Sequence, residues 1–388
     1  MRKFLFLVSA VLPELFRFFF VKLLLFFGVG KKYKNIWLIS ERGTDARDNG
    51  YFFFRYLKSE HPEISCYYVI EKKSPDYEKV AALGEVVHRR SFQHYLAFFG
   101  ASHLISTHIM GFSPNASVYM ILQKKNTCKL KGKQIFLQHG ITKDDIEGLK
   151  YPNVRLDLFV CGAKPEYEYI RDTYRHPDGV VKLTGLARYD TLANEERLQI
   201  LCMPTWRMWL NSLSAEEFAD SDYFHAYHSF LKRKDLHDWL RSKRMRLLFY
   251  PHYEFQRYIS LFSDIACDCI EICDFETHDV QTLLKEATLL ITDYSSVCFD
   301  VAYLKKPILF YQFDQEKFFG NHYKKGYFDE KEFGAVVYEE NKLLSLLQSL
   351  WDGNSFSNPY ISSQEAFFAG VEKGCCDRIY CAIRELEL

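Results

Sequence analysis

The sequence lacks the features that mark several common protein classes. It has no net charge, because 50 Lys and Arg residues balance 50 Asp and Glu residues, and this balance argues against a globally basic nucleic-acid binder. It has no GxGxxG fingerprint, so a nicotinamide-type dinucleotide site has no support. Of the eleven cysteines, Cys267, Cys269 and Cys273 come close together but have no second ligand cluster at zinc-like spacing. We therefore expect reduced thiols without a structural role.

A long uninterrupted apolar run is also missing, although the amino end is rich in Phe and Leu. Residues 4–27 are interrupted by Pro13 and Glu14, and Arg17 and Lys22 follow within the apolar stretch. A charge at mid-bilayer costs at least a few kcal/mol, so a plain transmembrane span is disfavoured. A cleaved signal peptide is disfavoured as well, because lysines rather than a small-x-small cleavage site come next.

The charges of this leader favour a membrane surface. Residues 1–34 carry seven basic groups and one acid, a net charge of +6, so the rest of the chain carries −6. We predict a membrane-associating segment over residues 1–34, an interfacial helix pair that breaks at Pro13 and lies on an anionic membrane. The alternative is a hydrophobic helix that docks on the protein's own core.

From residue 36 onward, short apolar runs alternate with segments of helical length. Such runs predict buried parallel strands. The first series is expected at residues 36–40, 66–70, 85–88, 103–107, 134–138, 156–160 and 181–185. The second series is expected at residues 199–203, 246–250, 270–273, 288–292, 308–312 and 335–338. Two such series predict an α/β fold with two doubly wound, Rossmann-like domains.

The boundary between the two domains is expected in the polar stretch from Asp190 to Arg197. We therefore predict an amino-terminal domain over residues 35–190 and a carboxyl-terminal domain over residues 191–388, with a terminal helix from residue 362. Ligands of open α/β sheets bind beyond the carboxyl ends of the strands. The side chains that directly follow the predicted strands are therefore the candidates for a site.

Two histidines follow predicted strands. His139 comes directly after the run QIFLQ, where a histidine with a pKa near 6.5 is suited to accept a hydroxyl proton. His252 follows the run RLLFYP in the second series, where it could contact a phosphate or a leaving group. The alternative for each is a loop histidine whose hydrogen bonds are already satisfied.

Other groups that suit a diphosphate follow strands too. The run LLITDYSSVCFD places Ser295 and Ser296 at the start of a predicted helix, where N–H groups and hydroxyls bind phosphate or simply cap the helix. Arg188 and Arg207 also follow strands, and the arginine fork binds a diphosphate in a bidentate way, although isolated surface arginines are common. No acidic pair of the DxD kind follows a strand, so a tightly held catalytic metal is not required.

In this order, the motifs resemble those of the CDP-glycerol glycerophosphotransferase family, which contains teichoic-acid primases and polymerases and their capsule relatives. The matching stretches are DNG at Asp48, QHGITK at Gln138, TGLARYD at Thr184, PTWR at Pro204, YPH at Tyr250, LLITDYSSVCFD at Leu289, KPILFYQFD at Lys306 and CCDRI at Cys375. The resemblance covers roughly residues 35–388.

The resemblance implies a fold of the GT-B type, in which two Rossmann-like domains face a cleft, and peripheral attachment at the cytoplasmic face of the cell membrane. It implies catalytic roles for His139 and His252. The residues implied to bind the donor, CDP-glycerol or CDP-ribitol, are Arg188, Arg207, Asp293, Ser295, Ser296 and Asp300. Those assigned to the acceptor side are Asp48, Asn49 and Lys143, of which Asp48 and Asn49 could equally cap a helix. No cofactor is implied, although a loosely held divalent metal is compatible.

The hypothesis that follows is a phosphoryl transfer. A hydroxyl of a lipid-linked or polysaccharide acceptor attacks the β-phosphate of the CDP-polyol, His139 takes its proton, and CMP leaves. One rival is a sugar-nucleotide-dependent GT-B glycosyltransferase of cell-surface polysaccharide synthesis, which donor screening would distinguish. The other is an inactive membrane-bound scaffold, which an assay of CMP release would distinguish.

Overall fold

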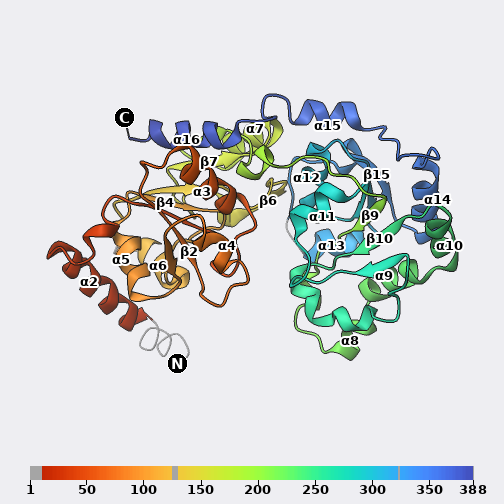
Figure 1. Ribbon diagram of the computed structural model, residues 1–388, viewed down its shortest axis with the longest axis horizontal. Coiled ribbons are helices and arrows are strands. Elements are labelled where there is room, and N and C mark those ends of the chain that lie inside the picture. The colour runs from red at the N-terminus through yellow and green to blue at the C-terminus, as the bar shows by residue number, and fades with distance from the viewer. Residues whose placement is uncertain (1–10, 125–129, 322–323, 388) are drawn as a thin grey trace. The chain divides into compact units, whose positions relative to one another are not determined.

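The computed structural model describes residues 11–124, 130–321 and 324–387 of the 388-residue chain. These residues divide into two compact units (Figure 1). Unit 1 takes the chain up to residue 139, residues 147–190 and the chain from residue 371 onward. Unit 2 takes residues 140–146 and 191–370.

Unit 1 contains a seven-stranded parallel sheet of the order β3-β2-β1-β4-β5-β7-β8. Its strands are β1 (Trp37–Ser40), β2 (Cys66–Ile70), β3 (Val86–His88), β4 (His103–Ser106), β5 (Lys133–Phe136), β7 (Leu158–Cys161) and β8 (Val181–Leu183). The central strands β1, β4 and β7 are buried at every position, as expected for strands covered on both faces. The order reverses direction between β1 and β4, as in doubly wound folds.

Two helices of unit 1, α3 (Asn49–Glu60) and α5 (Phe92–Gly100), begin with a side-chain cap. The Asp48 carboxylate accepts from the N–H of Asn49 at the start of α3, and the Ser91 hydroxyl accepts from the N–H of His94 in α5. The helices of this unit after α2 are α3 (Asn49–Glu60), α4 (Tyr77–Ala81), α5 (Phe92–Gly100), α6 (Ala116–Lys124), α7 (Lys164–Thr173) and α16 (Cys375–Glu385), with 3-10 turns η2 (Lys31–Tyr33), η3 (Glu147–Leu149) and η4 (Ala187–Asp190).

Helix α2 (Leu12–Phe26) packs against α5 through one face and exposes the other (Figure 1). Phe18 is buried beside Tyr95, whose hydroxyl donates to the carboxylate of Glu14 at 2.8 Å. The opposite face exposes Leu12, Phe16, Phe19, Phe20, Leu23 and Phe26. Pro13 lies in the first turn, where proline is tolerated, and the first member of the predicted helix pair falls on residues outside the described ones. Within the described part of the chain, no helix is long and apolar enough to span a membrane.

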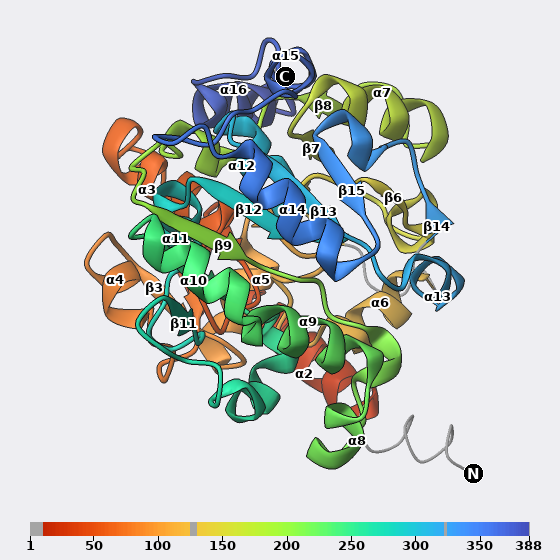
Figure 2. The ribbon, with the colours of Figure 1, turned by 90° about the vertical axis from the view of Figure 1, so that its right-hand side faces the viewer.

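Unit 2 contains a six-stranded parallel sheet of the order β11-β10-β9-β12-β13-β15, shown face-on in Figure 2. Its strands are β9 (Gln199–Cys202), β10 (Arg246–Phe249), β11 (Ile270–Ile272), β12 (Leu289–Thr292), β13 (Ile308–Tyr311) and β15 (Gly334–Val337). Numbered along the chain within this sheet, the order is 3-2-1-4-5-6, the strand order of the Rossmann fold. A separate antiparallel pair joins β6 (Asp144–Asp145) to β14 (Lys324–Lys325), and this pairing attaches residues 140–146 to unit 2.

The core of unit 2 is unusually aromatic. Tyr223, Tyr227, Phe230 and Phe249 are buried in one cluster between α9 and the strands. The helices of unit 2 are α8 (Ala215–Ala219), α9 (Asp222–Lys232), α10 (Lys234–Ser242), α11 (Val280–Glu286), α12 (Val297–Tyr303), α13 (Gln315–Asn321), α14 (Glu340–Leu350) and α15 (Ile361–Phe367), with 3-10 segments η5 (Met208–Leu210), η6 (Tyr253–Phe262) and η7 (Glu330–Glu332).

Each predicted apolar run overlaps a strand, and the α/β class is confirmed. Three expectations differ from the structure. Residues 140–146, predicted within the amino-terminal domain of residues 35–190, belong to unit 2. The single terminal helix expected from residue 362 is divided into α15 and α16, because Gly370 and Gly374 adopt positive φ between them. In addition, α16 belongs to unit 1 rather than to the second domain, since it contacts α3, β7 and η4.

The docking of α16 depends on close packing at Gly185. This residue has a φ of +78°, and a Cβ added to it would lie 2.5 Å from the Sγ of Cys375. The carboxylate of Asp190 accepts from the N–H groups of Cys375 and Cys376, each at 2.8 Å, at the start of α16. A side chain at position 185 would therefore displace the first turn of the helix.

We predict that Gly185→Ala lowers the free energy of unfolding by about 2–5 kcal/mol, because the methyl group meets both an unfavourable φ and a neighbouring helix. Gly179→Ala is the matched control, since Gly179 has a φ of +83° and no atom within 4 Å of an added Cβ. Gly179→Ala should lower the free energy of unfolding by only about 1–2 kcal/mol, the cost of the unfavourable φ. Urea denaturation measures both, and equal losses would contradict the packing role of Gly185.

Candidate functional site

In unit 1, polar loops gather at the carboxyl ends of the strands. Asp48 and Asn49 follow β1, His108 follows β4, His139 follows β5, and Arg188 follows β8. The carboxyl ends of parallel strands share one edge of a sheet, where ligands of open α/β folds bind. The structure thus places four predicted site residues from three distant parts of the sequence at one edge, namely Asp48, Asn49, His139 and Arg188.

The backbone before His139 is held in an uncommon conformation. Gln138 has a φ of +59°, which is rare for a residue with a side chain. Its side-chain amide donates to the carbonyl of Val160 at 2.6 Å and to the buried carboxylate of Glu166 at 3.0 Å. The amide of Asn49 donates to the Gln138 carbonyl at 2.8 Å. These bonds fix the direction in which His139 leaves strand β5.

Arg188 links three loops of unit 1. Its backbone N–H donates to Asn49 Oδ1 at 3.1 Å, and its Nη1 donates to Asp48 Oδ1 at 2.8 Å and to the carbonyl of His139 at 3.1 Å. The Arg188 side chain is buried, whereas that of Asp48 is part exposed. Arg188 was predicted on the donor side, but the structure places it with Asp48, Asn49 and His139, where it fixes the loop that carries the histidine.

His108 lies against His139, and sequence reasoning missed it. The two imidazole rings stack with centroids 4.9 Å apart and an interplanar angle of 16°. Arg42 Nε donates to His108 Nε2 at 3.2 Å, so the proton of a neutral His108 lies on Nδ1 and points to the hydroxyl of Thr107 at 3.0 Å. The signal was available, because His108 directly follows the predicted strand at residues 103–107.

Both histidines are neutral at pH 7. Desolvation, followed by the positive charges of Arg42 and Arg188, lowers the pKa of His139 to about 4. Desolvation, followed by His139 and Arg42, lowers the pKa of His108 to about 3. The His139 side chain is solvent-accessible, and water there opposes part of the burial effect, but the downward direction remains. A neutral imidazole is the form that can accept a proton.

In unit 2, His252 follows β10 and begins the segment η6. Its Nδ1 accepts from the N–H of Glu254 at 3.2 Å, so the proton of the neutral ring lies on Nε2. The ring stacks on Trp206 with centroids 6.0 Å apart and an interplanar angle of 23°. The side chain is half-buried, and its Nε2–H has the polarity required to donate to an anion.

Arg207 is in the interior of unit 2. None of its surface is exposed, and its Nε and Nη2 make a bidentate ion pair with Asp314 at 2.7 and 3.0 Å. A further ion pair joins it to Asp293 at 2.9 Å, and Asp293 Oδ1 accepts from the N–H of Thr205 at 2.8 Å. Arg207 and Asp293 were both predicted to bind the donor. In the structure they are buried, and their ion pair joins the loop after β9 to the loop after β12.

The two serines that follow Asp293 in the run LLITDYSSVCFD lie nearer the surface than Asp293 and Arg207 do. Ser295 and Ser296 are half-buried just before α12, and Ser296 makes no side-chain capping bond to this helix. The Ser295 hydroxyl accepts from the N–H of Val297 at a long 3.3 Å. Asp300 is buried within α12. Of this set, the serine hydroxyls are therefore the groups best placed for a ligand.

Lys143 also lies in unit 2, although it was predicted beside Asp48 and Asn49. Its ammonium group is buried and pairs with Glu330 at 3.1 Å and with Asp144 at 3.4 Å. It thereby anchors the segment of residues 140–146, whose strand β6 pairs with β14. In this structure its charge is neutralised within unit 2.

Two groups of potential metal ligands occur among the described residues, and neither includes a predicted site residue. The first joins His237 to Cys267 and Cys269, and the second joins Glu271, Cys273 and His278. The ligand atoms within each group lie within 4.8 Å of one another. That the chemistry requires no tightly bound metal stays a prediction.

The two parallel sheets and the polar loops at their carboxyl ends define a doubly wound α/β protein with two Rossmann-like units. The chain belongs to the CDP-Glycerol:Poly(glycerophosphate) glycerophosphotransferase family, whose model matches residues 18–385.

The relatives fall in the same family. The chain is 33% identical over 369 residues to the minor teichoic acid biosynthesis protein GgaB of Bacillus subtilis, covering 91% of this chain and 40% of that protein. It is 24% identical to a teichoic acid poly(glycerol phosphate) polymerase of Staphylococcus epidermidis, covering 74% and 41%. The chain thus spans about 40% of the length of these curated relatives.

Among solved structures, the wall teichoic acid polymerase TagF matches with a TM-score of 0.64 at 19% identity, over 92% of this chain and 90% of that one. The S. aureus MnaA–UDP structure matches with a TM-score of 0.54 at 11% identity, over 91% and 96%. At these identities the likeness concerns the fold.

The burial of Arg207 generates a stability prediction. Arg207→Met should lower the free energy of unfolding by about 3–5 kcal/mol, because Asp293 and Asp314 would remain buried without their counter-charge. Arg241→Met is the control, since Arg241 pairs with Asp268 at 2.7 Å on the surface, where a pair contributes about 0–1 kcal/mol. Chemical denaturation followed by tryptophan fluorescence measures both. A small loss for Arg207→Met would show that its charge is not needed by the fold.

Proposed function

We propose that this chain transfers a polyol phosphate from a CDP-polyol to a hydroxyl of a lipid-linked or polysaccharide acceptor in teichoic-acid or capsule synthesis. Glycerol phosphate from CDP-glycerol is the first choice of donor. Family membership supports this proposal, as do the names of the relatives, which include a teichoic acid poly(glycerol phosphate) polymerase. A TagF variant soaked with CDPG supports the choice of donor.

The observation that carries the proposal is the neutral His139 on a fixed loop at the carboxyl edge of the unit 1 sheet. In the proposed step, the acceptor oxygen forms a bond to the β-phosphorus while its proton passes to His139. The bond from that phosphorus to the bridging oxygen breaks, and CMP leaves with the bridging oxygen. Arg188 acts as a positioning residue, because it holds the His139 carbonyl rather than its ring.

We propose that unit 2 holds the donor. Ser295 and Ser296 offer hydroxyls beside the start of α12, and His252 offers an Nε2–H group. Charge that develops on the transferring phosphate is stabilised by such preorganised donors. Arg207 and Asp293 would act indirectly by holding the loop of the serines and the loop of Trp206, on which His252 stacks. The GT-B arrangement, with both units facing one cleft, is part of the same proposal.

We propose further that the chain lies on the cytoplasmic face of the cell membrane through α2. The exposed apolar face of this helix supports the proposal, because the transfer of large aromatic side chains from water into an acyl layer is favourable. The basic residues of the first 34 positions would meet anionic headgroups. The opposite face of α2 packs on α5, so the helix joins the membrane to unit 1.

The role of His139 is tested by His139→Gln, which keeps a polar side chain but cannot accept a proton. Turnover should fall about 10²–10⁴-fold, the usual contribution of a general base, while donor affinity stays near normal. The measurement is steady-state CMP release, with donor affinity titrated separately. His225→Gln, on the exposed surface of α9, is the control and should keep the wild-type rate. A His139→Gln variant with most of the wild-type turnover would remove the base role.

The pH profile gives a second test of the same residue. Because the pKa of His139 is lowered below its usual value, its neutral form persists to lower pH than that of an ordinary histidine, and turnover should fall only slightly as pH drops from 7 to 5.5. An unperturbed histidine, with a pKa near 6.5, would lose activity about eightfold over the same interval. If wild-type turnover falls eightfold and the residual turnover of His139→Gln does not, desolvation does not lower the pKa of His139 in the working enzyme.

The donor assignment is tested by the double variant Ser295→Ala and Ser296→Ala. It should weaken CDP-glycerol binding about 100-fold or more, because two hydroxyl bonds to a charged phosphate are lost and each contributes about 1.5–3 kcal/mol, while the melting temperature changes little. Calorimetric titration and thermal unfolding separate the two effects, and UDP-sugars in the same titration test the glycosyltransferase rival. A large fall in melting temperature with unchanged donor affinity would assign the serines to helix capping.

A further inference from the structure

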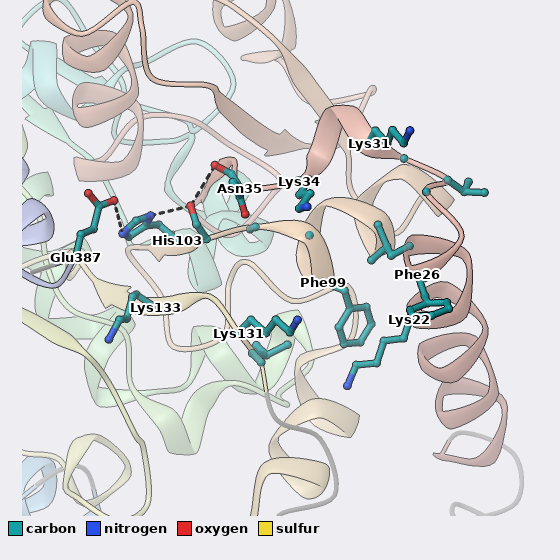
Figure 3. A pocket seen from close by; sticks show the side chains of 18 of the residues that line it. Lys22, Phe26, Lys31, Lys34, Asn35, Phe99, His103, Lys131, Lys133 and Glu387 are labelled. Carbon is teal, nitrogen blue, oxygen red and sulfur yellow. Dashed lines mark hydrogen bonds and ion pairs between the residues drawn. The ribbon is translucent and has the colours of Figure 1, made fainter.

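A pocket opens in unit 1 at the amino-terminal edge of its sheet (Figure 3). Its volume is about 990 Å³, and its walls come from the end of α2, the turn after it, the first residues of β4 and β5, and the end of α16. His139 comes six residues after Lys133, and an extended segment of that length spans roughly 20 Å. The pocket is therefore separate from the histidine pair at the carboxyl edge.

The pocket is rich in lysine. The lysines that line it are Lys22, Lys31, Lys34, Lys131 and Lys133. Lys133 lies 3.6 Å from Asp157, whereas Lys31, Lys34 and Lys131 form no ion pair with any residue that the structure describes. One carboxylate, that of Glu387, also lines the pocket, and it pairs with Arg384 at 2.8 Å. The pocket therefore holds a clear excess of positive charge.

His103 adds no charge to this excess. It lies at the base of the pocket with its Nε2 3.5 Å from Glu387, and its Nδ1 lies 3.0 Å from the Ser102 hydroxyl (Figure 3). Desolvation, followed by the charges of Arg384 and Lys133, lowers its pKa to about 4. At neutral pH the positive charge of the pocket comes from its lysines.

Apolar side chains stand next to these lysines. Phe26 and Val29 line the pocket and are 84% and 41% exposed, and Lys22 Nζ lies 5.1 Å from the centroid of the Phe99 ring. Phe27, which follows Phe26, is also exposed. The apolar rim thus continues into the exposed face of α2. Such a combination of cations and exposed apolar surface is suited to an amphiphilic anion.

Two glycines create this combination. Gly28 and Gly30 have φ values of +83° and +77°, which let the chain reverse direction directly after α2. The reversal brings Lys31 back toward the end of the helix, since an added Cβ at Gly28 would lie 3.0 Å from the Cε of Lys31. The cations therefore lie beside the apolar end of α2 rather than beyond it.

We propose that this pocket binds the phosphate headgroup of an anionic glycerophospholipid, with the acyl chains lying along the exposed face of α2. The proposal rests on the proposed membrane contact of α2 and adds a defined headgroup site to it. A free phosphate or a hydrophilic polymer would satisfy the lysines but would leave the exposed Phe26 and Val29 without a partner. Each lysine near an anionic bilayer strengthens binding about fivefold.

The test is flotation of the full chain with vesicles of phosphatidylcholine alone or mixed with phosphatidylglycerol. The pocket variant combines Lys34→Gln with Lys131→Gln, and the charge-matched control combines Lys72→Gln with Lys73→Gln, two exposed lysines that do not line the pocket. The pocket variant should bind mixed vesicles about 30-fold more weakly than the wild type. The control should lose much less, and binding to phosphatidylcholine should be equal in all three proteins.

Equal losses for the two variants would overturn the proposal, because the lysines would then act only as general surface charge. Titration of the wild type with short-chain phosphatidylglycerol below its micelle concentration should be saturable and weaker in the pocket variant. Inorganic phosphate and soluble poly(glycerol phosphate) are titrated in parallel. Binding of either as tight as that of the short-chain lipid would overturn the lipid assignment in favour of a free anion or a polymer.

Activity on a water-soluble acceptor separates this proposal from the proposed function. Both double variants should keep the wild-type rate of CMP release, since their lysines lie away from the histidine pair. In one outcome, the wild type shows no transfer while the pocket variant still loses binding to mixed vesicles. That outcome would contradict the proposed transferase function and support the proposed headgroup site. If the wild type floats with neither kind of vesicle, the membrane contact and the pocket proposal both fail, whatever the activity.

Discussion

The loops at the carboxyl edge of the unit 1 sheet depend on the hydrogen bonds that Arg188 and Asn49 make between them. Loops after parallel strands have no strand partner of their own, so something else must fix them. Arg188 reaches Asp48 and the carbonyl of His139, while Asn49 reaches the carbonyl of Gln138. The direction of the His139 side chain is therefore set by residues that are distant in sequence but buried beside it.

In unit 2, buried ion pairs hold the loops that follow the strands. Arg207 lies between Asp293 and Asp314 with none of its surface exposed, and aromatic rings surround its guanidinium. In such a weakly polarisable environment the ion pairs are strong once formed, but the loss of either sign leaves an uncompensated charge. The loop that carries Ser295 and the loop of Trp206, on which His252 stacks, thus depend on this network, and substitutions in it would disturb the fold and the candidate site together.

The strands could be predicted because burial on both faces produces continuous apolar runs that need no knowledge of the partner. The partners themselves could not be predicted. The amphipathic pattern of α16 shows an apolar face but not that this face meets Gly185 in unit 1. The motif of Arg207 indicates a charge after a strand, but only the packed structure shows that Asp314 neutralises it. His108 was within reach, since the strand-end rule that selected His139 applies equally to it.

The docking of α16 has a consequence for synthesis on the ribosome. Unit 1 is interrupted by residues 191–370, and its last helix is made only after the whole of unit 2. At typical rates of elongation this interval is roughly ten to forty seconds. Throughout that time Asp190 and the surface around Gly185 lack the helix that covers them. Unit 1 therefore presents an uncovered apolar surface until residues 375–385 emerge and α16 covers it.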